Sequence, residues 1–173
     1  NCGYDQQLRL CVTYNGYWLD ITEQKQAHER FEAVLRHAPL AFIFFDDNLR
    51  ITRANAAAHS MFGALYEQAL IGLRPDQPPL SPPIGDNVAL QDKLRGVLGR
   101  ITQQQIFSFE WRHTRLDGSP FDSEVVVIPF NENGRPNVCA IMQDITQRKA
   151  TEIALVEAKA AAQAATRAKS AVL

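Results

Sequence analysis

The sequence predicts an α+β fold: a five-stranded antiparallel sheet with helices on one face, flanked by N- and C-terminal linker helices. Two observations predict the sheet. Residues 107–142 contain three apolar or alternating runs separated by turn residues, and residues 41–54 contain two more short runs. A third observation, the helical spacing of apolar residues over 86–104, places a helix between the second and third strands.

The first two strands are expected to form a hairpin. In AFIFFDDNLRITRAN two apolar runs are joined by Asp46-Asp47-Asn48, whose side chains suit a tight turn. Residues 55–72 mix small and apolar types and predict short helical pieces. Residues 74–85 hold five prolines, so this segment is predicted to be a loop.

The last three strands are expected to form a meander. Residues 107–114 alternate apolar and polar types, and the turn sequence Leu116-Asp117-Gly118-Ser119 follows. Residues 121–130 read as the next strand, Asn133-Gly134 as a strong turn pair, and residues 138–142 as the last strand.

Two further helices are predicted, one before and one after the sheet in the sequence. Residues 8–19 are rich in β-branched and aromatic types and predict one strand that ends at Asp20. A helix follows from Thr22 to Pro39, with one narrow stripe that suits a coiled-coil seam of a homodimer: Ile21, His28, Phe31, Leu35 and Ala38. Residues 147–173 are Ala-rich and free of Gly and Pro, which predicts a long helix.

One internal repeat predicts the domain boundaries. YWLDITEQK (17–25) reappears as IMQDITQRK (141–149), each time after an apolar strand and at the start of a helix. We expect a tandem array, in which residues 1–22 are the closing strand of a preceding module and 23–38 a linker helix. Residues 39–146 are then the complete next module, and 147–173 a signalling helix.

Composition excludes several classes of function. The charge is nearly balanced, 18 basic against 19 acidic residues, so a nucleic-acid partner is not expected. The longest apolar run, residues 39–45, is far below the ~20 residues of a membrane span. The three cysteines are widely spaced, which argues against a disulfide frame or zinc site and favours a cytoplasmic location. Because the sequence starts without Met and ends inside a predicted helix, we expect it to be a piece of a longer protein. That longer protein can carry a membrane anchor outside this piece.

The order of elements resembles the PAS family over roughly residues 25–149. The matching features are Ala38-Pro39, the Asp46 turn, Asn55, Phe62-Gly63, Ile71-Gly72, Trp111 with Asp117-Gly118, and Asp144-Ile145-Thr146. Beyond the module, AATRAKSAVL (164–173) resembles the helix that enters the phosphoacceptor domain of hybrid histidine kinases, with the triplet Ala168-Lys169-Ser170. The resemblance implies a multi-PAS sensor histidine kinase as the parent protein, with its own response regulator.

The resemblance also implies a cavity on the concave face of the sheet. It places inside one row of each strand and parts of the short helices: Ile43, Phe45, His59, Phe62, Phe107, Phe109, Trp111, Ser123, Val125, Val127, Ala140 and Met142. Such a pocket is apolar and aromatic, with His59, Ser123 and His113 as polar groups, and suits a small apolar ligand. The alternative is that the large side chains simply fill the space.

The sequence argues against the family's common cofactors and against a metal. Flavin-binding relatives need a cysteine helix, but residues 55–105 contain no Cys. Haem-binding relatives carry an axial His on the longer helix, and residues 86–104 hold none, which leaves only His59. His28-Glu29 does not continue as a phosphoacceptor motif, and the histidines lack metal-ligand spacing.

We therefore expect a non-catalytic sensor and relay module of a histidine kinase, lacking the phosphoacceptor His and the ATP-binding domain. The alternative is a ligand-free dimerisation module that holds a kinase or a cyclic-dinucleotide synthase in register.

The relay is expected at Asp144, Ile145, Thr146 and Arg148. Thr146 is predicted to cap the helix with its hydroxyl. Asp144 is predicted to bind a basic partner, either Arg148 or one of the meander arginines Arg112 and Arg115.

Overall fold

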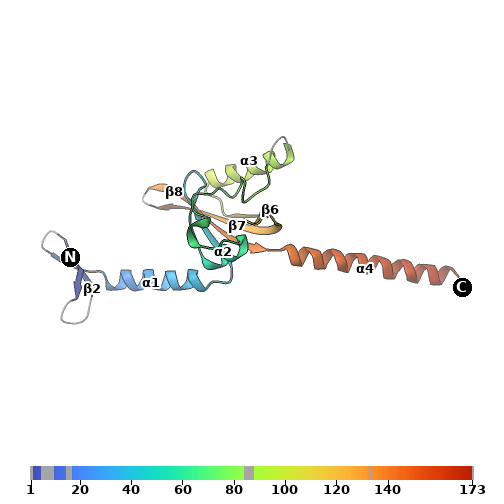
Figure 1. Ribbon diagram of the computed structural model, residues 1–173, viewed down its shortest axis with the longest axis horizontal. Helices are drawn as coiled ribbons and strands as arrows, with labels where there is room; N and C mark the ends of the chain where they lie inside the picture. Colours follow the sequence, from blue (N-terminus) through green and yellow to red (C-terminus); the bar gives the residue numbers. More distant parts are fainter. Residues whose placement is uncertain (1, 5–9, 15–16, 84–87, 133, 173) are drawn as a thin grey trace. The chain divides into compact units, whose positions relative to one another are not determined.

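The computed structural model describes residues 2–4, 10–14, 17–83, 88–132 and 134–172. The chain divides into two compact units, Asn1–Pro39 and Leu40–Leu173 (Figure 1).

The first unit contains a small antiparallel sheet and a helix. Strands β1 (Cys2–Tyr4), β2 (Leu10–Tyr14) and β3 (Tyr17–Asp20) pair in the order β1-β2-β3. The prediction of one strand over 8–19 is wrong where the segment is described, because β2 and β3 pair with each other and satisfy backbone groups that a single strand would leave open. Residues 8, 9, 15 and 16 lie outside the described part. Helix α1 (Thr22–His37) follows, as predicted.

The second unit contains the predicted five-stranded antiparallel sheet. Its strands are β4 (Ala41–Phe45), β5 (Ile51–Ala54), β6 (Phe107–Thr114), β7 (Pro120–Glu132) and β8 (Arg135–Asp144). They pair in the order β5-β4-β8-β7-β6, and every pair is antiparallel. The first hairpin and the later meander therefore join where β4 lies beside β8.

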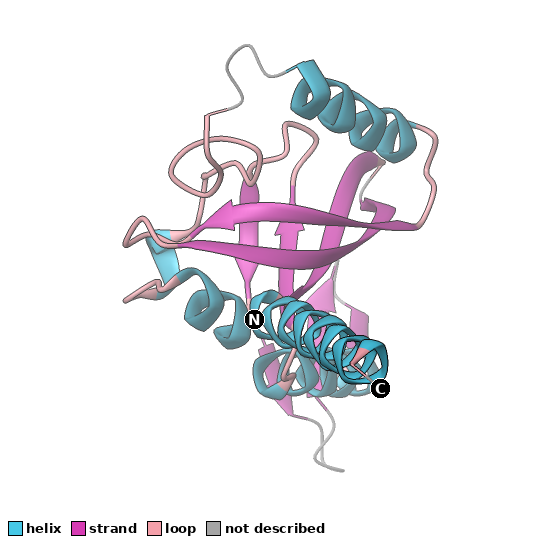
Figure 2. Ribbon diagram, turned by 90° about the vertical axis from the view of Figure 1, so that its right-hand side faces the viewer, coloured by secondary structure: helices cyan, strands magenta, loops and turns pink. Residues whose placement is uncertain are grey.

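In the sequence, helices lie between the second and third strands of this sheet, as predicted. They are α2 (Ala56–Phe62), the 3-10 turn η1 (Glu67–Ala69) and α3 (Val88–Thr102). In Figure 2, α3 lies above the paired strands β6 and β7. A long helix, α4 (Thr146–Ala171), follows β8 directly.

The core lies between one face of the sheet and this helical segment. Alternate residues of β4, β6 and β7 face the core, as the period of two in a strand predicts, whereas β8 buries the three consecutive residues Val138, Cys139 and Ala140. The buried cluster joins strand residues Ala41, Ile43, Phe45, Ile51, Trp111, Phe121, Val125, Val127, Val138, Ala140 and Met142 to Ala58, Phe62, Leu70 and Leu80.

Asn55 fastens the start of α2 to the first hairpin. Its side-chain oxygen accepts hydrogen bonds from the Ala58 N–H and the Phe42 N–H, both at 3.0 Å, and its amide donates to the Leu40 carbonyl. The first bond caps the helix and the other two fix its position beside β4. At the other end, Gly63 adopts the left-handed conformation (φ 68°) that commonly ends a helix.

A candidate ligand cavity and its connection to the last helix

A small cavity lies between the buried face of the sheet and α3. Its volume is about 70 Å³. Sixteen residues line it: Phe45, Leu49, Pro75, Asp76, Leu94, Val97, Leu98, Ile101, Phe109, Trp111, His113, Val125, Val127, Val138, Ala140 and Met142. The wall is almost wholly apolar, so the cavity can hold an apolar molecule but offers few polar contacts.

Seven residues that the sequence predicted for a cavity line this one: Phe45, Phe109, Trp111, Val125, Val127, Ala140 and Met142. The other five lie outside the lining. Ile43, Phe62 and Ser123 are fully buried in the core, and Phe107 stacks on Phe109 with ring centroids 5.8 Å apart. In α2, the Nε2 atom of His59 is buried without a hydrogen-bond partner among the described residues.

The sequence pattern did not predict the parts of the cavity wall that lie outside the sheet. Four side chains of α3 (Leu94, Val97, Leu98 and Ile101) and three loop residues (Leu49, Pro75 and Asp76) complete the cavity. Helical spacing in α3 identified its apolar face, which was a usable signal. Nothing in the sequence pattern showed that the Pro-rich segment crosses the cavity.

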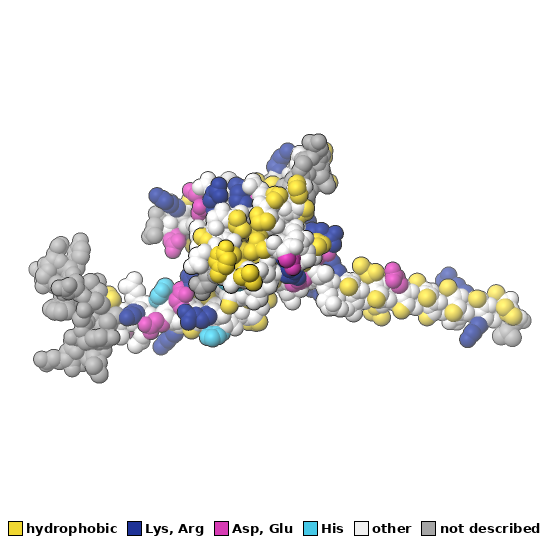
Figure 3. All heavy atoms as spheres, viewed as in Figure 1, with side chains coloured by type: hydrophobic (Ala, Val, Ile, Leu, Met, Phe, Trp, Pro, Cys, Tyr) yellow, Lys and Arg dark blue, Asp and Glu magenta, His cyan; other side chains and the backbone are white. Residues whose placement is uncertain are grey.

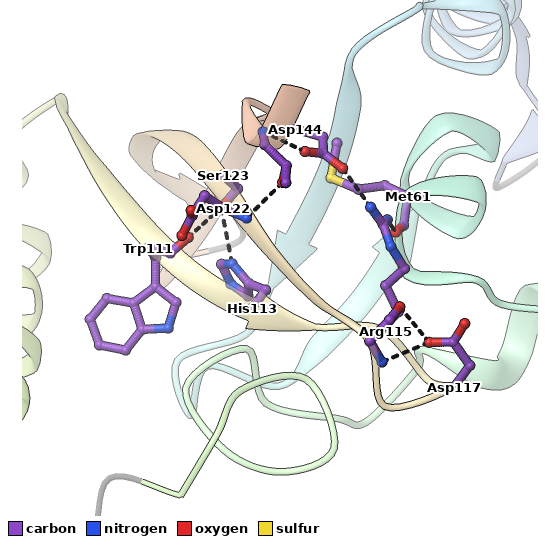
Figure 4. A network of polar contacts seen from close by, with 10 residues as sticks. Met61, Trp111, His113, Arg115, Asp117, Asp122, Ser123 and Asp144 are labelled. Atoms are coloured by element: carbon purple, nitrogen blue, oxygen red, sulfur yellow. Dashed lines mark hydrogen bonds and ion pairs between the residues drawn. The ribbon is translucent and has the colours of Figure 1, made fainter. Parts of the chain in front are cut away.

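A buried polar pair, His113 and Ser123, joins the last residues of β6 to β7. The Nδ1 atom of His113 lies 3.0 Å from the Ser123 hydroxyl, which donates to the Trp111 carbonyl at 3.3 Å (Figure 4). The His113 ring stacks on Phe121 and meets Phe62 edge-on. Burial lowers the pKa of His113 to about 4, so the imidazole is neutral at physiological pH.

Hydrogen bonds tie the Pro-rich loop to β6 and order the loop internally. The Trp111 indole donates to the Ser81 hydroxyl at 2.9 Å, and Ser81 donates to the Pro75 carbonyl at 2.5 Å. Asp76, which is 7% exposed, accepts two bonds from the Arg74 guanidinium at 3.0 and 2.9 Å. This paired geometry gives directional as well as ionic attraction.

The start of α4 is tied to the sheet through Asp144. One carboxylate oxygen accepts from the Thr146 N–H at 2.9 Å, and the other lies 2.6 Å from the Arg115 guanidinium (Figure 4). Arg115 also donates to the Met61 carbonyl at the end of α2. Of the three arginines considered from the sequence, Arg115 is thus the one that binds Asp144.

The predicted role of the Thr146 hydroxyl is wrong. Ile145 occupies the N-cap position without a side-chain cap, and Thr146 is the first helical residue. Its hydroxyl instead accepts from the Asp122 N–H at 3.0 Å, while the Ile145 N–H donates to the Asp122 carbonyl at 2.9 Å. The physical reason is that the Asp144 carboxylate already takes the first free N–H, which leaves the hydroxyl available to β7.

Acidic side chains of the meander offset the two basic residues in the first turn of α4. Arg148 lies 3.5 Å from Glu124, and Lys149 lies 2.5 Å from Glu110. The contact lowers the pKa of Glu110 and raises that of Lys149. A positive charge at a helix N-terminus is unfavourable by itself, so these carboxylates make the sequence compatible with the helix start.

A protein-family comparison matches the family described as PAS fold over residues 35–150. The chain belongs to the PAS family. This agrees with the resemblance in the sequence, and the match covers the sheet, the cavity and the connection to α4.

Solved structures show the same fold. A PAS domain from a two-component sensor histidine kinase aligns with TM-score 0.57 and 15% identity, covering 70% of this chain and 98% of that one. The PAS domain of an HTR-like protein from Haloarcula marismortui aligns with TM-score 0.56 and 23% identity, covering 71% and 95%.

A third structure is a complex with a small molecule. It is the PAS domain, in complex with ethanol, of a LuxR-family transcriptional regulator from Burkholderia thailandensis. It aligns with TM-score 0.51 and 16% identity, covering 66% of this chain and 96% of that one. The comparison with curated proteins returned no match.

A PAS domain is a sensory module and is not catalytic by itself. Within the described residues, no helix is both long and apolar enough to cross a membrane. The described residues also contain no group of three or more His, Cys, Asp or Glu side chains that could hold a metal ion.

Proposed function

We propose that this PAS domain is the sensor and relay module of a two-component sensor histidine kinase. It binds a small apolar molecule in the cavity and transmits the binding event through α4 to a kinase domain of the same chain. That kinase in turn phosphorylates a response regulator. The parent protein is bacterial, and this part of it works in the cytoplasm.

The observation that carries the proposal is the short path from the cavity to the helix. Met142 lines the cavity and lies two residues before Asp144 on β8. His113 lines it from β6 and lies two residues before Arg115, the partner of Asp144. A ligand that shifts either strand end therefore acts directly on the ion pair that holds the start of α4.

The size and chemistry of the cavity support a very small ligand. Its volume of about 70 Å³ is well below the roughly 300–1,000 Å³ of pockets for drug-sized molecules. The ethanol complex of the related LuxR-family PAS domain is consistent with a ligand of this size.

We also propose a dimer. Along α1, Phe31 is 49% exposed and His28 is exposed, so both can contact a second copy, whereas the predicted seam residue Leu35 is 5% exposed and already buried within the chain. Figure 3 shows apolar side chains along the whole exposed length of α4. The sequence spacing gives α4 two Ala-rich seams, one through Ile153, Val156 and Ala160 and another through Leu155, Ala158, Ala162, Ala165 and Val172. Two seams on one helix allow two registers of a coiled coil, which suits a switch.

The two Asp-Ile-Thr joints support the proposed domain boundaries, because they have the same local geometry. The Thr22 N–H donates to Asp20 at 3.0 Å, as the Thr146 N–H does to Asp144 at 2.9 Å. The backbone angles of Ile21 (φ −112°, ψ 13°) match those of Ile145 (φ −111°, ψ 9°). This supports residues 1–22 as the end of a preceding PAS module, 23–38 as a linker helix, 39–146 as the PAS domain and 147–173 as the signalling helix.

The small cavity also favours a second candidate, a ligand-free dimerisation module that holds a catalytic domain in register. In that case the large side chains around Trp111 are filling a core, and the residual space has no occupant.

Native mass spectrometry of freshly purified protein separates the two candidates. A sensor carries, or takes up from a library of small apolar compounds, one equivalent of ligand, and Met142→Trp abolishes the uptake. A dimerisation module shows neither co-purified mass nor uptake, and this result would contradict the sensor proposal.

A further inference from the structure

Two titratable side chains stand out in the otherwise apolar lining of the cavity. Asp76 comes from the Pro-rich loop and His113 from β6, and they are 7% and 3% exposed. The only other polar group of the lining side chains, the Trp111 indole N–H, is already bonded to Ser81. Polar contacts with a ligand therefore fall to Asp76 and His113.

Asp76 can only accept a hydrogen bond. Its two oxygens each accept one bond from Arg74, whose charge balances that of the carboxylate. A carboxylate oxygen has more than one acceptor position, so each oxygen can accept a second bond. Because the pair is neutral as a whole, the site does not need a cationic ligand.

His113 also presents an acceptor. The Ser123 hydroxyl has one hydrogen, and it is directed to the Trp111 carbonyl at 3.3 Å. With the hydroxyl hydrogen on that carbonyl, the 3.0 Å contact between Ser123 and Nδ1 of His113 is made by an imidazole hydrogen on Nδ1, and this is the tautomer that we assign. In a neutral imidazole this leaves Nε2 without a hydrogen.

From these two acceptors we infer that the cavity selects small uncharged molecules that combine an apolar body with a hydroxyl group, such as alcohols and phenols. The inference rests on the proposed function of the cavity as a ligand site. The hydroxyl donates to Asp76 or His113, and the apolar body packs on Phe109, Val127 and Met142. An ion of either sign would lose its hydration in an apolar cavity without an opposite charge to replace it.

The first test compares two probes of nearly equal size on the unaltered protein. Phenol and fluorobenzene share the ring and differ in one group, and only phenol donates a hydrogen bond. Affinities are measured by 1H–15N NMR titration of the amides of β6 and β8. We expect phenol to bind about tenfold more tightly, the value of one hydrogen bond to a charged or buried acceptor.

The second test removes each acceptor without leaving an unpaired charge. The double variant Arg74→Met/Asp76→Leu removes both members of the ion pair, and His113→Phe retains an aromatic ring beside Phe121. We expect at least one of them to reduce the preference for phenol to twofold or less while fluorobenzene still binds. Asp92→Asn, which alters an exposed carboxylate of α3, serves as the control and should preserve the preference.

The outcomes separate the inference from the proposed function. Equal binding of phenol and fluorobenzene to the unaltered protein would overturn the inference and leave the cavity as an apolar ligand site. A preference for phenol that survives both acceptor variants would also overturn it. Binding of neither probe, with no response of β6 or β8 amides, would contradict the proposed ligand site itself.

Discussion

Arg115 and Asp144 connect three parts of the PAS domain that are distant in sequence. The guanidinium of Arg115 lies 2.6 Å from the Asp144 carboxylate, donates to the Met61 carbonyl at the end of α2, and lies 4.3 Å from the centroid of the Phe121 ring. Side chains of both partners are less than one third exposed, so solvent screens the pair only partly. The pair thus fixes the start of α4 to the sheet and to α2.

Replacing Asp144 with Asn should measure the ionic part of this connection. The amide oxygen can still accept from the Thr146 N–H, but the charge that faces Arg115 is lost. We expect a loss of about 1–2 kcal/mol in the free energy of unfolding, measured with urea. Asp92→Asn, which breaks the exposed pair with Arg95, should cost less than about 0.5 kcal/mol. Equal losses in the two variants would show that the Asp144 pair has no special role.

The Arg115–Asp144 pair should also make the stability of the domain depend on pH. Burial raises the pKa of Asp144, but hydrogen bonds from Thr146 and Arg115 outweigh it and hold the pKa below the ordinary value of 3.8. The stabilisation is therefore complete above that value and is lost as the pH falls through the lower pKa of the folded state. Asp144→Asn should remove this part of the acid sensitivity.

Met142→Trp should fill the cavity. Met142 is 1% exposed and lines the cavity from β8, so a larger side chain at this position occupies the space of a ligand. We expect loss of ligand binding and a cost of about 1–3 kcal/mol from overpacking. Ile141→Trp places the same side chain on the opposite face of the strand and should leave binding intact. Unchanged affinity in Met142→Trp would show that the ligand binds elsewhere.

His113 should make the domain less stable in mildly acidic solution. Burial lowers its pKa from 6.5 to about 4, so the unfolded chain takes up a proton before the folded domain does. Stability that is complete above pH 6.5 should fall by up to about 3 kcal/mol as the pH decreases towards 4. Thermal unfolding of His113→Phe over this range checks the prediction, because the variant should show a flatter profile between pH 6.5 and 4. A profile identical to that of the unaltered protein would contradict it.

The sheet and its buried face could be predicted because they depend on local rules. The period of two divided each strand into two rows, and the family resemblance selected the row of Phe45, Trp111 and Val125 as the inward one; all three are buried. Turn residues such as Asp46 gave the connections, and Asp46 indeed accepts from the Asn48 and Arg50 N–H groups.

The other wall of the cavity and the joint at α4 depend on tertiary packing, which the local pattern does not contain. Asp76 reaches the cavity because Ser81 of the Pro-rich loop is bonded to Trp111 of β6 and because Arg74, in the same loop, binds Asp76. The choice among the three arginines likewise depended on geometry. Arg112 pairs with Asp122 and Arg148 with Glu124, which leaves Arg115 for Asp144.

Phe31→Glu should prevent dimerisation if α1 supplies a seam. Phe31 is 49% exposed, and a carboxylate at a helix–helix interface would be desolvated and would face its own copy. Light scattering over a range of protein concentrations should show a dimer for the unaltered chain and a monomer for the variant. Ala33→Glu adds the same charge on the opposite side of α1 and should leave the dimer intact. A monomer at every concentration before any substitution would refute the prediction.

Thr146→Val should loosen the first turn of α4 from β7 without unfolding the helix. The Thr146 hydroxyl is the acceptor for the Asp122 N–H, and valine has nearly the same shape but no acceptor. The Asp122 amide would then depend on water, so we expect its hydrogen exchange to become about five- to tenfold faster, as loss of one hydrogen bond predicts. Thr151→Val is the matched control, because the Thr151 hydroxyl donates to the Gln147 carbonyl within the helix and has no contact with β7 in that bond. Faster exchange at Asp122 in the first variant alone would show that Thr146 fastens the helix to the sheet. Equal exchange in both variants would mean that the Asp144 ion pair holds the start of α4 by itself, and that any signal from the cavity must reach the helix through Arg115.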